Sequence, residues 1–316
     1  MSVDLVHSMP NRERASGRPD LASSLELLKP ITWFPPMWAF GCGVISAPAP
    51  VGGRLGAILA GVALAGPLVC ATSQAVNDWF DRHVDAINEP QRPIPSGRIP
   101  GRWGLYIACL WTVLSLAVAA ALGVWVFAAA CLGLALAWAY SAPPFRLKRN
   151  GWFGNAACGL CYEGLAWVTG AAVAAGGALP DARIFVVAAL YSAGAHGIMT
   201  LNDFKSIEGD QRMGLGSLPV RLGQERAARV ACLCMALPQA IVVALLAIWD
   251  RPLHAVIVLA ALLAQLALMP RLLADPRARA PWYNATGVTL YVLGMAAAAF
   301  ALRSILSAAP LMAAAS

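Results

Sequence analysis

Two acidic segments of the sequence have matching residue types and spacing. The first reads Asn77-Asp78-x-x-Asp81-x-x-x-Asp85, and the second, 125 positions later, reads Asn202-Asp203-x-x-Ser206-x-x-x-Asp210. At about 100° per residue, side chains three, four or seven positions apart share one face of a helix. Each segment therefore presents its acids as one group, provided that it is helical.

Grouped carboxylates at the edge of an apolar region repel one another unless a cation lies among them. Mg²⁺ takes oxygen ligands, keeps several waters and is usually completed by substrate phosphates. We expect two Mg²⁺ ions that bridge a diphosphate. The expected ligands and catalytic acids are Asp78, Asp81 and Asp85 for one ion and Asp203 and Asp210 for the other. Asn77 and Asn202 are candidate substrate contacts beside them.

Glu208 is a further candidate substrate contact. It lies about 140° from Asp203 on an ideal helix, so it joins the second group only if the chain unwinds near Gly209. The alternative for both acidic groups is a set of solvated ion pairs with Arg82, Arg92, Lys205 and Arg212. Because two matching groups occur, we favour metal binding.

A basic connection, Tyr140-Ser-Ala-Pro-Pro-Phe-Arg146-Leu-Lys148-Arg149, lies between two apolar segments. Its cations can neutralise phosphate oxygens, and an Arg can do so through two parallel hydrogen bonds. We expect Lys148 to act in catalysis, and Tyr140, Arg146 and Arg149 to bind substrate. Taken alone, this loop is typical of any basic loop beside a membrane. Together with the acids, it indicates a lipid diphosphate whose head is bridged by Mg²⁺ while its tail enters an apolar interior.

The composition places these motifs in a membrane protein. Of 316 residues, 59% are hydrophobic and 12% are charged, and the mean hydropathy of +0.65 excludes a cytosolic enzyme. The formal charge of +7 is better explained by a membrane than by nucleic acid, and no nucleic-acid partner is expected. All eight cysteines fall in apolar runs and are interpreted as small core residues, since Cys158-x-x-Cys161 lacks the second pair of a zinc site.

A helix needs about 20 mostly apolar residues to cross a bilayer, and the sequence predicts an all-α integral membrane protein with nine crossings. The apolar segments are 31–49, 54–76, 103–121, 123–140, 152–176, 182–203, 227–249, 253–273 and 283–308. Residues 1–28 are polar and carry both signs of charge without a signal peptide, so we expect a partly disordered cytoplasmic tail. Residues 29–316 would form one membrane domain with cap loops at 77–102, 141–151 and 204–226.

The distribution of Lys and Arg predicts the orientation. The side that includes the N-terminal tail carries 19 of the 23 basic residues, and the other side carries only Arg54, Arg183, Arg251 and Arg303. By the positive-inside rule, the tail and both acidic segments face the cytoplasm.

These motifs resemble those of the UbiA-type intramembrane prenyltransferases. The first acidic motif looks like the first signature of that family, and the Tyr140–Arg149 loop and the second acidic group follow in the expected order. The resemblance covers about 280 of the 316 residues. It implies a helical bundle around a central cavity open to the bilayer, and Mg²⁺-dependent transfer of a prenyl group from its diphosphate.

A narrower resemblance is to the chlorophyll and bacteriochlorophyll synthase branch of that family. It rests on the strings NDWFDRHVDAINEPQRPIPSGRIPG (77–101) and HGIMTLNDFKSIEGDQRMGLGSLPVRLG (196–223). Ser206 and the Ile-Glu208-Gly-Asp210 run depart from the general second signature but are similar to the version in this branch, which leaves open whether Glu208 binds metal. The branch implies transfer of a geranylgeranyl or phytyl group to the propionate of a chlorophyllide or bacteriochlorophyllide.

Between the two pigments we favour bacteriochlorophyllide, because the tail lacks plastid targeting character; cyanobacterial chlorophyll synthases would share that feature. The expected location is a bacterial inner membrane, either cytoplasmic or intracytoplasmic and photosynthetic. Protein partners in pigment assembly cannot be read from the sequence.

This reaction suggests roles for several residues inside the apolar segments. Glu163 and His196 are expected either to contact the pigment or to form structural pairings between helices. An allylic carbocation needs an apolar chamber and aromatic faces, for which Trp79, Phe80 and Tyr191 are candidates. The competing functions are prenyl transfer to an aromatic quinone precursor and, from another class, ion-coupled transport through inverted repeats.

Overall fold

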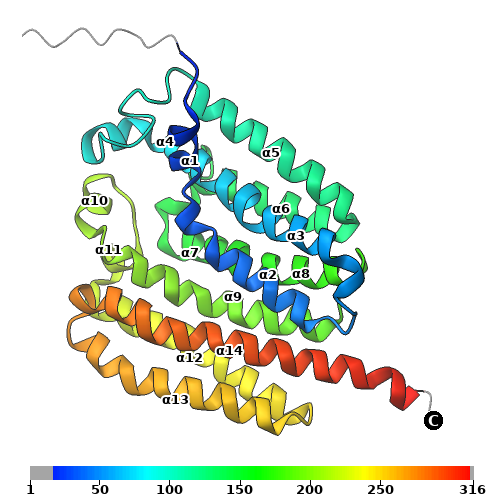
Figure 1. Ribbon diagram of the computed structural model, residues 1–316. Coiled ribbons are helices and arrows are strands. Elements are labelled where there is room, and N and C mark those ends of the chain that lie inside the picture. The colour runs from blue at the N-terminus through cyan, green and yellow to red at the C-terminus, as the bar shows by residue number, and fades with distance from the viewer. Residues whose placement is uncertain (1–16, 314–316) are drawn as a thin grey trace, which may run out of the picture.

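The structure is a computed structural model that describes residues 17–313, with side chains as far as residue 308. The longer helices are α1 (Leu21–Leu28), α2 (Phe34–Ser46), α3 (Leu55–Ala63), α4 (Ala71–Asn88), α5 (Trp103–Leu122), α6 (Val124–Ser141), α7 (Gly151–Gly159), α8 (Ala166–Ala174), α9 (Ala182–Asp203), α10 (Ile207–Arg212), α11 (Leu218–Leu222), α12 (Gln224–Ile248), α13 (Pro252–Ala274) and α14 (Pro276–Ala313). Short 3₁₀ or π segments are η1 (Pro30–Thr32), η2 (Gly52–Arg54), η3 (Leu64–Cys70), η4 (Leu147–Arg149) and η5 (Leu160–Leu165). The long helices run side by side along one direction (Figure 1).

Eight helices in the described part of the chain are long and apolar enough to cross a membrane. The predicted all-α, multi-pass class is therefore confirmed, but the ninth crossing is not. The predicted segment 31–49 forms η1 and α2, and α2 has only 13 residues. Prolines explain the short helix, because Pro35 and Pro36 occupy its first turn while Pro48 follows its end.

Two of the eight spans are continuous helices with a π-helical interruption. The first runs from Gly52 to Asn88 through η3, and the second runs from Gly151 to Ala174 through η5. Pro67 lies within η3, where it supplies no backbone N–H, and its carbonyl accepts a hydrogen bond from the Trp111 indole at 3.0 Å. π-Helical bulges frequently occur at functional sites, and both of these border the cavity described below.

The N-terminal segment is partly helical. Helix α1 begins after Asp20, whose carboxylate accepts a hydrogen bond from the Ser23 backbone at 2.8 Å, and it buries Leu27 and Leu28. Residues 21–28 of the expected tail therefore form an ordered helix that packs beside α4. Residues 1–16 lie outside the described part of the chain.

Small residues allow close contact between neighbouring spans. A Cβ atom at Gly170 of α8 would lie only 2.0 Å from the Phe40 carbonyl oxygen of α2, and one at Gly43 would lie 1.9 Å from the Trp167 carbonyl oxygen. The backbones of α2 and α8 thus touch directly, which places the short α2 inside the bundle.

The segments that the sequence analysis singled out lie at one end of the bundle. The ends of α4, α10 and α11 meet there, on the left in Figure 1. Asn88 at the end of α4 contacts the Met213 sulfur after α10 at 3.9 Å. The basic loop before α7 also reaches this end, because the Gly151 amide donates to the Gly216 carbonyl and the Gly216 amide donates to the Arg149 carbonyl.

Candidate active site

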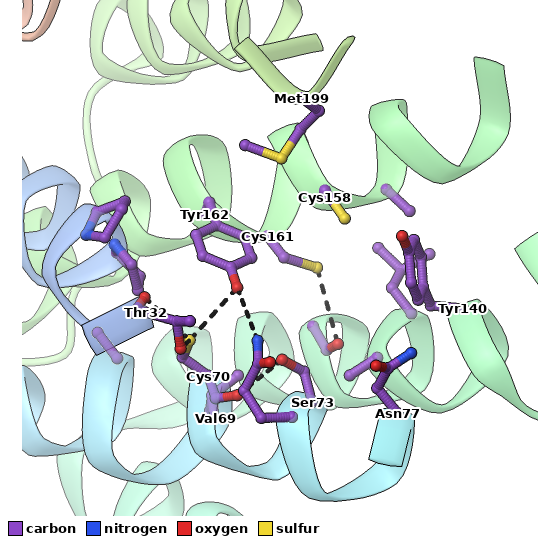
Figure 2. A pocket seen from close by; sticks show the side chains of 18 of the residues that line it. Thr32, Val69, Cys70, Ser73, Asn77, Tyr140, Cys158, Cys161, Tyr162 and Met199 are labelled. Carbon is purple, nitrogen blue, oxygen red and sulfur yellow. Dashed lines mark hydrogen bonds between the residues drawn. The ribbon is translucent and has the colours of Figure 1, made fainter. Parts of the chain in front are cut away.

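A cavity of about 370 Å³ lies between α2, η3, α4, α6, α7, η5 and α9 (Figure 2). Asn77, Tyr140 and Asn202 line its polar part, which adjoins the acidic and basic segments. Pro36, Ala65, Val69, Gly133 and Leu136 belong to its apolar part. A second cavity of about 40 Å³ shares four of these apolar residues and continues between Leu64, Ala130 and Leu165. A polar head and a long apolar tail would fit these two parts.

Three thiols and two tyrosines also line the main cavity. Cys70, Cys158 and Cys161 border it, so these cysteines are not simply core residues, although all eight are free thiols. The Tyr162 hydroxyl accepts a hydrogen bond from Gln74 at 3.2 Å and contacts the Cys70 sulfur at 3.5 Å (Figure 2). Sequence analysis did not select Tyr162; its signal was a hydroxyl inside an apolar segment, next to the more conspicuous Glu163.

The aromatic residues expected around a carbocation lie elsewhere. The guanidinium of Arg82 covers the Trp79 ring at 4.1 Å, and Phe80 packs edge-on against Trp138. Tyr191 is buried in the core, stacked on Trp167 at 5.7 Å. None of the three expected rings is among the residues that line the cavity. The composition of an apolar segment does not show which of its rings face the cavity. The sequence therefore could not distinguish these three rings from Tyr140 and Tyr162.

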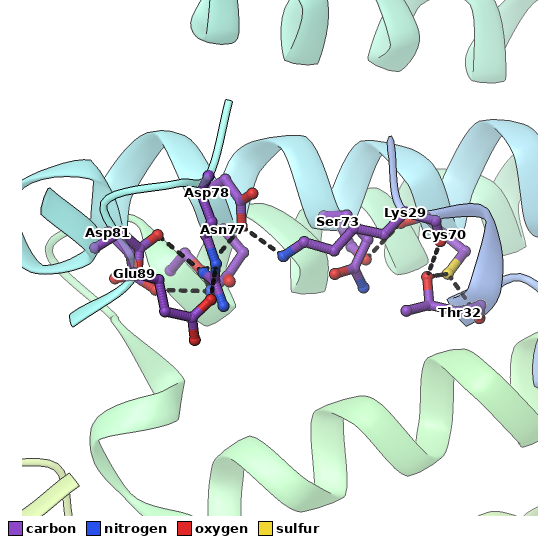
Figure 3. A network of polar contacts seen from close by, with 12 residues as sticks. Lys29, Thr32, Cys70, Ser73, Asn77, Asp78, Asp81 and Glu89 are labelled. Carbon is purple, nitrogen blue, oxygen red and sulfur yellow. Dashed lines mark hydrogen bonds and ion pairs between the residues drawn. The ribbon is translucent and has the colours of Figure 1, made fainter. Parts of the chain in front are cut away.

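Helix α4 continues past Asn77 to Asn88, as the sequence predicted, and presents the first acidic group. Asp78 is 1% exposed, and its Oδ1 lies 2.6 Å from Lys29 Nζ and 3.5 Å from Arg92 Nη1. Arg92 also pairs with Asp85 at 2.9 Å and with Glu89. Arg92 therefore forms the local ion pairs that were considered as the alternative to metal binding. Lys29 is an additional partner of Asp78 (Figure 3).

Asp81 is paired with the basic loop. Lys148 Nζ lies 2.5 Å from the Asp81 carboxylate, and Arg146 Nη2 lies 3.7 Å from it. The Asn77 amide donates to Asp81 at 3.0 Å and to Ser141 Oγ at 3.1 Å. Burial lowers the pKa of Lys148, while the adjacent Asp81 opposes this shift by favouring the charged ammonium. The loop that follows α6 is thus fastened to α4 across the mouth of the cavity.

Two of the cations in this network have left-handed backbone conformations. Lys29 has φ of 47° and Arg146 has φ of 45°, a region that costs a residue other than glycine about 1 kcal/mol or more. Such strain tends to occur where the surrounding structure imposes it at functional sites. Lys29 was not among the candidate site residues, because nothing in the sequence connects it with Asp78, 49 positions away.

The second acidic group has neutral partners. Helix α9 ends at Asp203, whose Oδ2 accepts a hydrogen bond from the buried Asn155 at 3.1 Å. Asp210 of α10 accepts from the Ser206 hydroxyl at 3.2 Å. Burial raises the pKa of Asp210, and hydrogen bonds from serine hydroxyls oppose this shift. Asn155 was missed because an amide in an apolar segment gives no signal of its partner.

Glu208 and Arg149 point away from the cavity. The helix breaks at residues 204–206 and not near Gly209, which lies inside α10, and Glu208 is exposed and pairs with Arg277 of α14 at 2.5 Å. Arg149 is exposed, and its backbone amide and carbonyl are bonded to the Arg146 carbonyl and the Gly216 amide. The expected substrate contacts of Glu208 and Arg149 therefore disagree with this geometry.

Glu163 and His196 are buried but are not among the residues that line the cavity. Glu163 follows Tyr162, so one step along the helix turns it away from the cavity. His196 packs against Trp152 at 5.5 Å. Glu163 Oε2 and both His196 ring nitrogens have no hydrogen-bond partner within the part of the chain that the structure describes. The expected pigment contacts thus receive no support from the cavity.

The oxygen donors of the site fit Mg²⁺ and a diphosphate. Among the described residues, no three His, Cys, Asp or Glu side chains converge as a complete metal cage. Mg²⁺ does not require one, because it is commonly held by one or two carboxylates together with waters and substrate phosphates. Asp78 Oδ2 is buried and has no hydrogen-bond partner among residues 17–308, so it offers an oxygen to a cation.

The fold and the site together define a multi-pass helical membrane enzyme whose cavity has an acidic and basic rim. Residues 32–293 match the UbiA prenyltransferase family, and the chain belongs to that family. It is therefore a prenyltransferase, which excludes the alternative of an ion-coupled transporter. The family resemblance drawn from the motifs is confirmed.

Named relatives and one solved structure agree with this assignment. The chain is 60% identical over 287 residues to the bacteriochlorophyll synthase 33 kDa chain of Cereibacter sphaeroides, which covers 91% of this chain and 95% of that one. It is 38% identical over 294 residues to the chloroplastic chlorophyll synthase of Oryza sativa, and the match covers 88% of this chain and 76% of that one. A UbiA homologue from Archaeoglobus fulgidus, bound to GPP and Mg²⁺, shares the fold, with a TM-score of 0.64 at 21% identity over 89% of this chain and 99% of that one.

Proposed function

We propose that this chain esterifies the propionate carboxylate of bacteriochlorophyllide with a geranylgeranyl or phytyl group taken from its diphosphate. The observation that carries this proposal is the 60% identity over 91% of the chain to a bacteriochlorophyll synthase chain, compared with 38% to a chlorophyll synthase. The cavity supports the choice of donor, because its polar part leads directly into an apolar one.

Two Mg²⁺ ions bridge the diphosphate in this proposal. Their ligands would be Asp78, Asp81 and Asp85 for one ion and Asp203 and Asp210 for the other. When bound, the ions would stabilise the negative charge that develops on the leaving diphosphate. The carboxylates of both groups lie at one end of the bundle, which supports a shared ligand.

Side chains of the rim hold and stabilise the reacting group. Lys148 and Arg146 neutralise diphosphate oxygens as the bond between C1 and oxygen breaks and its electron pair leaves with the diphosphate. Asn77, Asn202 and Tyr140 line the polar part of the cavity and orient the head group.

The apolar part of the cavity protects the allylic cation from water. The rings of Tyr140 and Tyr162 line the same cavity and can stabilise the cation by cation–π attraction. A propionate oxygen of the acceptor then forms the ester bond to C1. No protein base is required, because a carboxylate is already ionised near neutral pH.

The topology belongs to the same proposal. Helix α2 would complete nine crossings, since it packs backbone to backbone on α8, although its 13 residues span only about 20 Å. The rim would face the cytoplasm of a bacterial photosynthetic membrane, because 19 of 23 basic residues lie on that side of the predicted topology.

Transfer assays with defined acceptors test the function. Purified protein in lipid nanodiscs receives radiolabelled geranylgeranyl diphosphate, Mg²⁺ and either bacteriochlorophyllide, chlorophyllide, hydroxybenzoate or homogentisate. We expect label in the ester of bacteriochlorophyllide at a higher rate than in any other product. An Asp81→Asn variant controls for spontaneous transfer. Label in a quinone precursor, without labelled pigment ester, would overturn the proposal.

A further inference from the structure

The two acidic groups differ in how their charge is compensated. Each aspartate of α4 has a cationic partner: Asp78 has Lys29 and Arg92, Asp85 has Arg92, and Asp81 has Lys148 and Arg146. These partners come from three separate parts of the chain, namely the end of α1, the loop after α4 and the loop after α6 (Figure 3 shows the first). The first group is thus neutralised by the protein itself.

Asp203 and Asp210 lack such compensation. Their hydrogen-bond donors are the amide of Asn155 and the hydroxyl of Ser206, both of which are uncharged. Within the described part of the chain, no Lys or Arg nitrogen lies within 4.0 Å of either carboxylate. The nearby Glu208 has its own partner in Arg277. The second group therefore has no cationic side chain in contact with it among the described residues, and Lys205 attracts Asp203 only from a greater distance. A bound cation would supply the compensation at short range.

We propose that the divalent cations load in a fixed order: Asp203 and Asp210 take an ion without substrate, and the aspartates of α4 take theirs only together with the diphosphate. This order rests on the two ions of the proposed function. An ion that approaches α4 without substrate finds Asp78 Oδ2 free, but it must either lie beside Lys29, Arg92 and Lys148 or displace them from the carboxylates, and their positive charges oppose both.

A diphosphate removes this obstacle, because its oxygens give the displaced cations new anionic partners. The metal and the diphosphate therefore bind cooperatively at α4, and by linkage each increases the affinity for the other by the same factor. Lys29 is the clearest participant. Its left-handed backbone directs Nζ to within 2.6 Å of Asp78, and its side chain is partly exposed, so it can move from carboxylate to phosphate.

Direct counting of bound Mn²⁺ by electron paramagnetic resonance tests the order without relying on turnover. We expect the purified chain to bind one Mn²⁺ without substrate and two in the presence of geranylgeranyl S-thiolodiphosphate, an analogue that reacts poorly. The double variant Asp203→Asn and Asp210→Asn should lose the ion that binds without the analogue. Asp81→Asn should keep this ion and lose the one that needs the analogue.

A second variant separates charge compensation from simple loss of a ligand. Lys29→Met should increase the affinity for the second Mn²⁺ without the analogue about tenfold or more, because it leaves Asp78 partly uncompensated. Arg102→Met is the matched control, since Arg102 is an exposed cation at the N-terminus of α5 that pairs with no aspartate among the residues that the structure describes, and it should change nothing. Each variant is first shown to elute and unfold like the parent.

Three results would overturn the proposed order. They are two ions bound without the analogue, no ion bound without it, and loss of the first ion in Asp81→Asn but not in the double variant. Failure of the proposed function is a separate outcome. A chain that counts ions as expected but prenylates another acceptor would disprove the pigment assignment and leave the loading order intact.

Discussion

Lys148 lies against Asp81 with its Nζ 2.5 Å from the carboxylate, although 67 positions of sequence separate the two residues. The contact joins the basic loop to α4 at the mouth of the cavity, where Asn77 also binds Asp81. A buried ammonium held in this position can pass from the carboxylate to an incoming phosphate. The same contact therefore serves both the empty and the loaded site.

Lys148→Met should lower the rate of prenyl transfer at saturating substrate about 100-fold, because it removes one donor to the leaving diphosphate. Asp81→Asn should cause a similar loss. The double variant should be little worse than either single one, since the two residues act as a unit. Arg102→Met is the control. Losses that multiply in the double variant would show that the two side chains act independently.

Removal of divalent metal should abolish transfer without unfolding the protein. The aspartates of α4 are already neutralised by Lys29, Arg92 and Lys148, so the fold does not depend on an ion as a structural zinc site does. We expect EDTA to lower the midpoint of thermal unfolding by only a few degrees, and Mg²⁺ to restore activity fully. Cooperative unfolding on chelation at 25 °C would contradict this prediction.

Gly133→Leu should shorten the space available to the prenyl tail. Gly133 lines both cavities, and a Cβ there would lie 3.6 Å from Leu165 and 3.8 Å from Val69, which is ordinary contact. Gly133→Ala should therefore be tolerated, while the larger leucine should raise KM for geranylgeranyl diphosphate about tenfold or more and leave KM for geranyl diphosphate within about twofold. Equal losses for both donors would show that the tail takes another path.

Gly170→Val should destabilise the bundle. The new side chain would meet the Phe40 carbonyl 2.0 Å from its Cβ, and backbone atoms cannot move aside as a flexible side chain can. We expect a loss of about 1–3 kcal/mol in the free energy of unfolding, or no folded protein at all. Gly41→Ala, on the open face of α2, is the matched control and should unfold like the parent. Thermal unfolding in detergent measures both.

Acid should weaken the attachment of α1 to the loop after α4. Arg98 lies 2.8 Å from Glu26 and holds the pKa of that carboxyl below its ordinary value. A lowered folded pKa means that the stabilisation is complete above the unfolded pKa, about 4.3, and is lost as the pH falls through the folded pKa. The pair is exposed to solvent, so its contribution to stability is small. Parent and Glu26→Gln should therefore differ in unfolding midpoint at pH 7, and the difference should shrink as the pH falls below the unfolded pKa and through the folded one.

Much of the architecture followed from periodicity and hydropathy. Eight of the predicted apolar segments form membrane-length helices, and α4 carries its acids on a continuous helix as their spacing indicated. The segment at 31–49 was too proline-rich to form a helix of that length. Hydropathy measures apolar content, so it does not register that a proline lacks the backbone N–H that a helix needs.

The acids themselves were readable from the sequence, but their partners were not. Lys29 and Asn155 reach Asp78 and Asp203 from other helices, so no spacing rule connects them. Glu208 illustrates the opposite error. Its acidic neighbours in the sequence suggested that it binds substrate or metal, yet α10 directs its side chain to Arg277. Only the position of α14 in the folded chain shows this pairing.

The paired backbone hydrogen bonds between Arg149, Gly151 and Gly216 fasten the basic loop to the segment that follows α10. These two stretches form one hydrogen-bonded wall, so we expect that neither swings aside alone to admit a bulky ring system. The wall made by α1 and the loop after α4 is joined by side-chain ion pairs as well as by the buried Leu27, Leu28 and Ile99, and it has no such pair of backbone hydrogen bonds among the described residues. The rate at which substrates enter the cavity should therefore depend on salt concentration. A cross-link between α1 and the loop after α4 should inhibit the enzyme, whereas a cross-link between the basic loop and the segment that follows α10 should not.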